Sequence, residues 1–205
     1  MPHRQYVLTL PKLLRVYFRH DRAMLRKLCQ IAYASVLLYM QKALRREDGQ
    51  VGMVIAVQSF GEYLNVHPHV HAIVADGLFT RQGMFYVMPR MSTRWLEAIF
   101  RAKLISMLVK EGRLAKELGK KLMSWTHSGF STHHGQPVKR EDQEGLKRLS
   151  QYIIRNPFSE EKMIYKPAEQ KVIYKSKLSK KTKRNCHHPA YPRQRSTAGT
   201  ILWMV

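Results

Sequence analysis

The sequence predicts an α+β fold, with helices packed on one face of an antiparallel sheet. Short apolar or alternating runs, typical of strands, share the 205-residue chain with longer segments of helical periodicity. Hydrophobic residues make up 44% of the chain, which is enough to build a core. The expected order is one strand, a helix, two strands, a hairpin, helices and a second hairpin.

The first half of the chain supplies most of the predicted sheet. Its apolar runs are short and end at proline, glycine or Asp-Gly, which is typical of strands. The predicted strands are residues 5–10, 51–58 and 66–75, followed by a hairpin of 78–79 with 84–88. Farther along, the alternating segments 162–166 and 171–175 predict a second hairpin.

Helical periodicity predicts three further regions. Apolar residues recur on one face from Asp21 to about Arg46, with basic residues at both ends of the segment. The other predicted helices are 92–109 with a capping Ser92 or Thr93, a continuation over 114–123, and about 141–155. The intervening residues 124–138 are expected to form a loop.

The charge of the chain indicates a polyanionic partner. Lys and Arg number 36 against 14 Asp and Glu, which gives a net charge of +22 and a pI near 10.3. Counterion release from phosphates would dominate binding by such a protein. A membrane surface is the rival partner, but the sequence has no apolar run long enough to span a bilayer and no signal peptide. Cys29 and Cys186 form neither metal spacing nor a disulfide framework, so we expect a cytoplasmic, nucleoid-associated protein.

The composition changes at Ser176. We expect residues 1–175 to form one folded domain and residues 176–205 a basic tail that is disordered or read in a shifted frame. Such charged runs are usually just solvated. In a chain this basic, however, we expect Lys175, Lys177 and Lys180 to contact phosphates.

Three histidines alternate along the predicted strand 66–75, which places their side chains on one face. Neighbours in this set, such as His69 and His71, have Cα atoms about 6.7 Å apart, whereas His67 and His71 are roughly 13 Å apart. One ion can therefore be shared by a pair but not by all three. Val70 can anchor the opposite face in the core, while Pro68 belongs at a strand start or edge. This contrast favours His69 and His71 as the pair that shares one ion.

A divalent metal, Mg²⁺ or Mn²⁺, is the ligand that this pair predicts. Two imidazoles leave room for a third protein ligand, waters and a substrate phosphate. Candidates for the third ligand are Gln58, His127, His133 and Asn156. The alternative is that the imidazoles are merely hydrogen-bonded on a polar sheet face.

Tyr152 is the candidate nucleophile. It lies on a predicted helix, and Asn156 four residues later would stand about 6 Å away on the same face. Arg148 or Arg155 could hold a neighbouring phosphate. The alternative is an amphipathic core residue with its hydroxyl at the rim. Since the chain has ten tyrosines, spacing alone does not select this one.

Several segments resemble the transposase domain of rolling-circle insertion sequences, in the two-tyrosine (IS-ninety-one-like) branch of the HUH endonuclease superfamily. They are HPHVHAIVADGLF, WTHSGFSTH and LSQYIIRNPFS, with PHRQYVLTLPKLLRVYF and QSFGEYLNVHPHVH. The resemblance covers about residues 2–185. It implies a ferredoxin-like, RRM-related palm, in which His69 and His71 bind the metal and Tyr152 faces them as the nucleophile. The implied reaction is metal-dependent nicking of single-stranded DNA at transposon ends, through a 5′-phosphotyrosine and a free 3′-hydroxyl, followed by strand transfer.

The chain departs from that family pattern at three places. The second tyrosine is replaced by Asn156, as in single-tyrosine relatives that carry an amide there, and Tyr165 is a weaker substitute. The cysteine-rich zinc module that usually comes first is missing, and the pattern stops near Asn185. We therefore expect a truncated transposase. The alternatives are a non-catalytic, basic single-stranded nucleic-acid-binding protein and a metal-dependent hydrolase that activates water.

Overall fold

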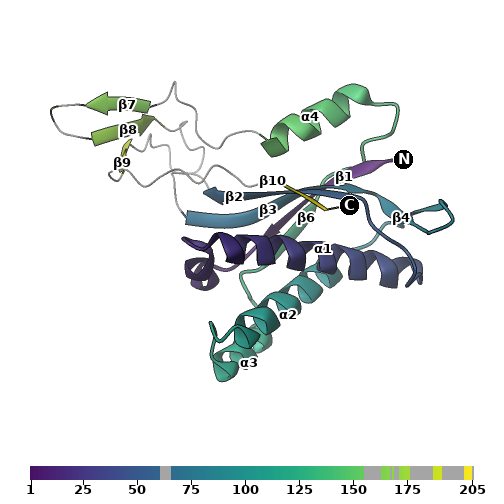
Figure 1. Ribbon diagram of the computed structural model, residues 1–205, viewed down its shortest axis with the longest axis horizontal. Helices are drawn as coiled ribbons and strands as arrows, with labels where there is room; N and C mark the ends of the chain where they lie inside the picture. Colours follow the sequence, from purple (N-terminus) through teal and green to yellow (C-terminus); the bar gives the residue numbers. More distant parts are fainter. Residues whose placement is uncertain are drawn as a thin grey trace.

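The computed structural model describes residues 1–60, 66–154, 163–166, 168, 171–175, 187–190 and 201–204. Their fold is α+β, as expected, and is organised around an antiparallel sheet (Figure 1). The strands of this sheet, in spatial order, are β10 (Ile201–Met204), β2 (Met53–Phe60), β3 (Val66–Ala75), β1 (His3–Thr9) and β6 (Ser131–His134). The two central predicted strands therefore lie side by side as β2 and β3, and the first strand of the chain pairs with β3.

The helices divide between the two faces of the sheet (Figure 1). The helical elements are η1 (Lys12–Phe18), α1 (Arg22–Leu44), α2 (Arg94–Lys110), α3 (Lys116–Ser124) and α4 (Gln143–Ile154). One face is covered by α1 and α2, with α3 packed on α2, whereas α4 lies across the opposite face over β3. The class is confirmed, but the helices do not all lie on one face: α4 is amphipathic and follows β6, from which the chain passes to the other side of the sheet.

Two smaller sheets complete the described fold. They are the hairpin of β4 (Gly77–Phe79) with β5 (Phe85–Val87), and a sheet of β7 (Met163–Lys166), β8 (Lys171–Lys175) and β9 (His187–Ala190). Both predicted hairpins are thus present. Within residues 176–205, β9 pairs with β8 and β10 pairs with β2. The boundary expected at Ser176 stays a prediction.

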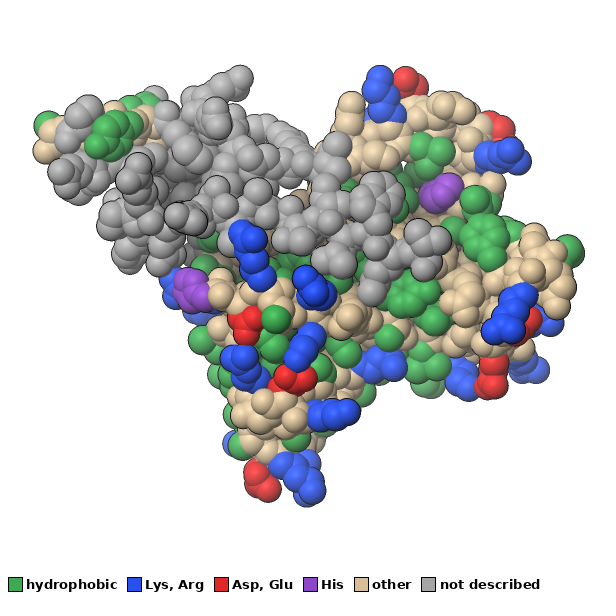
Figure 2. Space-filling view, viewed as in Figure 1, with side chains coloured by type: hydrophobic (Ala, Val, Ile, Leu, Met, Phe, Trp, Pro, Cys, Tyr) green, Lys and Arg blue, Asp and Glu red, His purple; other side chains and the backbone are tan. Residues whose placement is uncertain are grey.

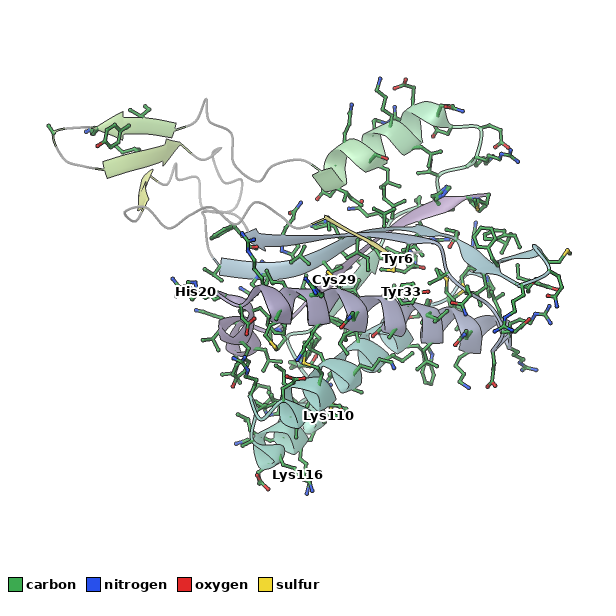
Figure 3. The ribbon with its side chains drawn as sticks, viewed as in Figure 1. Tyr6, His20, Cys29, Tyr33, Lys110 and Lys116 are labelled. Atoms are coloured by element: carbon green, nitrogen blue, oxygen red, sulfur yellow. The ribbon has the colours of Figure 1, made fainter. Side chains whose placement is uncertain are left out.

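The core lies between the sheet and α1. Leu8, Ile55 and Val70 point toward the face that α1 covers and are fully buried. Tyr6 and Cys29 lie in the same layer (Figure 3), where burial raises the pKa of the Cys29 thiol to about 11. The predicted apolar stripe of α1 is confirmed, since all its members are buried: Leu25, Leu28, Ala32, Val36 and Tyr39.

Side-chain hydrogen bonds cap both α1 and α2, and the sequence predicts a cap for α2 alone. The Asp21 side chain accepts hydrogen bonds from the backbone N–H groups of Ala23 and Met24, and so caps α1. At the start of α2, Ser92 Oγ accepts from the Arg94 N–H, while the Thr93 side chain makes no capping bond. Of the two residues considered at that position, Ser92 therefore satisfies the helix N-terminus.

Strand β6 corrects one prediction, because it lies inside the expected loop 124–138. Its sequence STHH contains no apolar residue and so lacks the alternation that identifies strands. It pairs with β1, and its one buried side chain, Thr132, donates a hydrogen bond to the Thr93 carbonyl. Tertiary pairing, rather than local sequence, makes this segment a strand.

None of the helices in the described part of the chain has the length and apolarity that a membrane crossing requires.

Candidate metal and tyrosine site

The alternating histidines of β3 stand in a row on the face that α4 covers. Ring centroids of His67 and His69 are 4.9 Å apart, and those of His69 and His71 are 4.8 Å apart. Between them, Val70 is fully buried on the opposite face and holds the strand in register. Strand β3 begins at Val66, so His67 lies at the strand start, as predicted.

His69 is fixed by its own strand. Its Nδ1 lies 2.6 Å from the backbone carbonyl oxygen of His67, which can only accept a hydrogen bond. Nδ1 therefore carries the proton, and Nε2 keeps its lone pair. A histidine that donates Nδ1–H to a carbonyl in this way is set up to bind a metal through Nε2.

His71 is the more buried of the preferred pair, with 3% of the residue exposed. Its Nδ1 lies 3.3 Å from the side-chain amide nitrogen of Gln5 on β1. A 180° flip of the Gln5 side-chain amide exchanges its nitrogen and oxygen, so that Oε1 can accept a hydrogen bond from a protonated Nδ1 of His71. The lone pair of His71 Nε2 is then free. His71 Nε2 is buried and has no hydrogen-bond partner among the described residues.

The histidines are electrostatically suited to ligate a cation. Burial lowers the pKa of His67 and of His71 to about 4, and burial also lowers the pKa of His69. The imidazoles are thus neutral at pH 7, which is the form that binds metals. The positive charge of Arg15 adds to the lowering at His67 and His69, so a cation is disfavoured at that end of the row and better accommodated near His71.

A metal ion fits the donors of this pair, because the orphaned Nε2 of His71 needs a partner and Nε2 of His69 has a free lone pair. The described residues contain no group of three or more His, Cys, Asp or Glu that could hold a metal, so further ligands would be amides, waters or phosphate. Gln58 is the register partner of His69 on β2 and shares its face of the sheet. The candidate His127 is exposed in a loop. His133 on β6 and His71 on β3 are both register partners of Val7, so His133 shares the face of the histidine row but lies on the far side of β1, with its Nε2 2.8 Å from Ser131 Oγ.

Tyr152 is brought onto the histidine row by α4. Its ring centroid lies 5.5 Å from that of His71, with an angle of 66° between the ring planes. The neighbouring Ile153 is 4% exposed and anchors the end of the helix, while Tyr152 is 51% exposed. The ring therefore touches a buried imidazole and still has access to solvent, an arrangement that suits a nucleophile for a large substrate.

Only some of the basic residues predicted to hold phosphate lie in the described part of the chain. Arg148 is exposed on α4, and its Nη2 lies 4.0 Å from Asp142 Oδ1. Such a surface pair is weak and leaves the guanidinium available. Arg155, Asn156, Lys177 and Lys180 lie outside the described residues, and Lys175 lies on β8 without a described side chain. Their predicted roles stay predictions.

Two residues near the row were not identified from the sequence. Gln5 could have been suspected, because it alternates with the apolar residues of its strand and so belongs to the sheet face opposite the core. Arg15 lies in the short helix η1, which follows β1 and packs against β3. No sequence periodicity indicates where a short 3₁₀ segment of this kind points.

Comparison with known proteins places the chain among transposases. Residues 52–191 match the family described as "Putative transposase". Over 84 residues the chain is 37% identical to the transposase for insertion sequence element IS801 of Pseudomonas savastanoi pv. phaseolicola. The aligned segment covers 41% of this chain and 20% of that transposase, so the chain spans about a fifth of its relative. No solved structure matches the chain.

Proposed function

Since this chain belongs to the Putative transposase family, we propose that it nicks and rejoins single-stranded DNA, with Tyr152 as nucleophile beside a divalent metal at His69 and His71. The observation that carries the proposal is the ring contact between Tyr152 and His71. It joins a helix and a strand that are distant in the sequence, and it puts the one phenol of α4 next to the histidine pair.

The reaction conserves the energy of the broken bond. The phenolate oxygen of Tyr152, after loss of its proton to water, attacks a backbone phosphorus atom. A bond forms between phosphorus and the tyrosine oxygen, and the bond to the 3′-oxygen breaks, so that this oxygen leaves and takes up a proton as a 3′-hydroxyl. Attack by a 3′-hydroxyl on the phosphotyrosine reverses the step and rejoins a strand.

The histidine pair would hold the metal through Nε2 of each ring, with Gln58 or Asn156 as the amide ligand. When bound, Mg²⁺ or Mn²⁺ polarises the phosphoryl oxygens and stabilises the charge that develops on the leaving oxygen. The described chain supplies the orientation: the His67 carbonyl fixes His69, Gln5 fixes His71, and Ile153 seats the helix that carries Tyr152.

The charge of the chain supports a DNA substrate. The net charge is +22, and basic side chains outnumber acidic ones on the face shown in Figure 2. Arg148, one turn before Tyr152 on α4, would contact a phosphate near the one that is attacked. Single strands are favoured as substrate because Tyr152, half-exposed on the helix that lies over the sheet, can reach their backbone and stack with their bases.

A nicking assay on labelled single-stranded oligonucleotides, with Mn²⁺ or Mg²⁺, tests the proposal. We expect a covalent protein–DNA adduct that is lost in Tyr152→Phe and retained in Tyr165→Phe, where the exposed tyrosine of β7 serves as a matched control. An adduct lost only in Tyr165→Phe reassigns the nucleophile. Cleavage without any adduct indicates a hydrolase that activates water, and salt-sensitive binding without cleavage indicates a non-catalytic binding protein; either outcome overturns the proposal.

A further inference from the structure

We infer that Arg15 binds a backbone phosphate of the DNA beside the metal that His69 and His71 hold. This role rests on the function proposed above and concerns how the same site retains its DNA. The three features that support it are the position of Arg15, its lack of a counter-ion and the charge that a bound metal would bring.

Arg15 is held at the His67 end of the histidine row. Its Nε donates a hydrogen bond to the Leu10 carbonyl at 3.4 Å. Leu10 directly follows Thr9, the register partner of His69 on the neighbouring strand. The short helix η1, which carries Arg15, also packs against β3, the strand of the histidine row.

Arg15 has no anionic partner in the described part of the chain. No carboxylate lies within ion-pair distance, and neither Nη1 nor Nη2 makes a hydrogen bond there. The side chain is nevertheless partly buried, and burial lowers its pKa. Arg4, also partly buried, is instead paired with Asp76 through contacts of 2.7 and 3.0 Å. A desolvated guanidinium whose fork is free is suited to receive two oxygens of a phosphate.

A metal at the histidine pair changes the electrostatics around Arg15. The guanidinium and a divalent cation repel each other when nothing lies between them. A phosphodiester that contacts both removes that repulsion, because its negative charge faces two positive groups at once. Arg15 should therefore oppose metal binding in the absence of DNA and favour DNA binding in the presence of metal. Substitution of a residue that only supports the fold would not tighten metal binding while it weakens DNA binding.

The experiment uses Arg15→Gln and the matched control Arg19→Gln in a Tyr152→Phe background, which prevents covalent products. Arg19 is the exposed C-cap residue of the same short helix, so each substitution removes one positive charge from η1 or its cap. Binding of Mn²⁺ alone is measured by calorimetry, and binding of a short labelled single-stranded oligonucleotide is measured at saturating Mn²⁺ by anisotropy.

We expect Arg15→Gln to weaken oligonucleotide binding about tenfold, the usual scale for a charge-assisted phosphate contact. The same change should tighten Mn²⁺ binding about threefold, because one repulsive charge is removed. Arg19→Gln should change neither affinity by a comparable factor. Arg15→Lys, which keeps the charge but loses the fork, should restore wild-type Mn²⁺ affinity and only part of the oligonucleotide affinity.

Three outcomes would overturn the role of Arg15: both affinities fall in Arg15→Gln, both glutamine variants behave alike, or oligonucleotide binding is unchanged. If the parent protein binds no Mn²⁺, the metal in the proposed function is wrong. Oligonucleotide binding, measured again without metal, then still tests whether Arg15 contacts phosphate. If it does, Arg15→Gln must lower the oligonucleotide affinity more than Arg19→Gln does.

Discussion

The two faces of the central sheet are built from the same strands and have opposite properties. On the face toward α1, Leu8, Ile55 and Val70 are fully buried and purely apolar. On the face toward α4, the same strands carry Gln5, Gln58 and the histidine row. Neighbouring residues of β3, such as Val70 and His71, thus belong to different environments. One face stabilises the fold and the other carries groups that can react. Because consecutive residues of a strand point to opposite faces, a stabilising residue and a reactive one can be direct neighbours in the sequence.

The two faces also contribute to the stability of the fold with opposite signs. Full burial of an aliphatic side chain on the α1 face stabilises the fold by about 1.5–3 kcal/mol. Nε2 of His71, which is buried and has no hydrogen-bond partner among the described residues, instead costs on the order of 1–3 kcal/mol. Substitutions on the two faces should therefore separate into those that affect unfolding and those that affect the reaction.

The largest effect is expected on the α4 face, from His71→Ala. Loss of a metal ligand should reduce adduct formation about a thousandfold, equivalent to about 4 kcal/mol in the activation barrier. The free energy of unfolding should change by less than about 1 kcal/mol, because a buried group without a partner is removed along with some packing. Adduct yield over time and denaturant unfolding measure the two quantities. His20→Ala, at an exposed site on the chain between η1 and α1, is the control and should leave both unchanged; wild-type nicking by His71→Ala would refute the metal assignment.

A smaller effect of the opposite kind is expected on the α1 face, from Leu8→Ala. Leu8 is fully buried opposite Val70, so the cavity should lower the free energy of unfolding by about 3 kcal/mol. Adduct formation at low temperature, where the protein remains folded, should stay near the wild-type rate. Val7→Ala changes the adjacent, partly buried residue on the other face and should cost about 1 kcal/mol. An equal cost for the two variants would mean that the faces do not differ as described.

The smallest effect is expected at Gln5, which touches His71 without belonging to the histidine row. Gln5→Met keeps the size of the side chain but removes the acceptor for His71 Nδ1–H, and should weaken Mn²⁺ binding about tenfold. Gln5→Glu retains an acceptor and should bind Mn²⁺ at least as tightly as the wild type. Calorimetric titration distinguishes the two, and unfolding curves should show similar stability for both. Equal Mn²⁺ affinity in the two variants would show that Gln5 does not orient His71.

Much of this organisation could be predicted from local sequence pattern. The continuous apolar run of β2 and the alternation of β3 identify both central strands, and the histidine spacing identifies the face that they share. The stripe of α1 and the amphipathic pattern of α4 follow from helical periodicity in the same way. These features are visible because each is set by residues only a few positions apart.

Features that depend on long-range register could not be predicted in this way. The contact of Gln5 with His71 requires the pairing of β1 with β3, and β6 is a strand only because β1 offers it a free edge. Tyr152 could be placed near His71 only through the family resemblance, since periodicity identifies the face of α4 but not the surface on which it lies. The position of Arg15 depends on the short helix η1, which has no periodic pattern in the sequence from which it could be predicted.

Strand β1 lies inside the sheet, between β3 and β6, and this position limits where the protein can be cut for expression. The match to the family begins at residue 52, and a fragment cut at that limit would lack both β1 and α1. Strand β3 would then lose its neighbour on one side, leaving an open edge next to an uncovered apolar surface. Open, apolar edges of this kind recruit strands from other molecules, so such a fragment should aggregate rather than fold. We therefore expect residues 1–51, outside the matched region, to be needed in any fragment, because they supply both the strand that pairs with β3 and the helix that covers its apolar face.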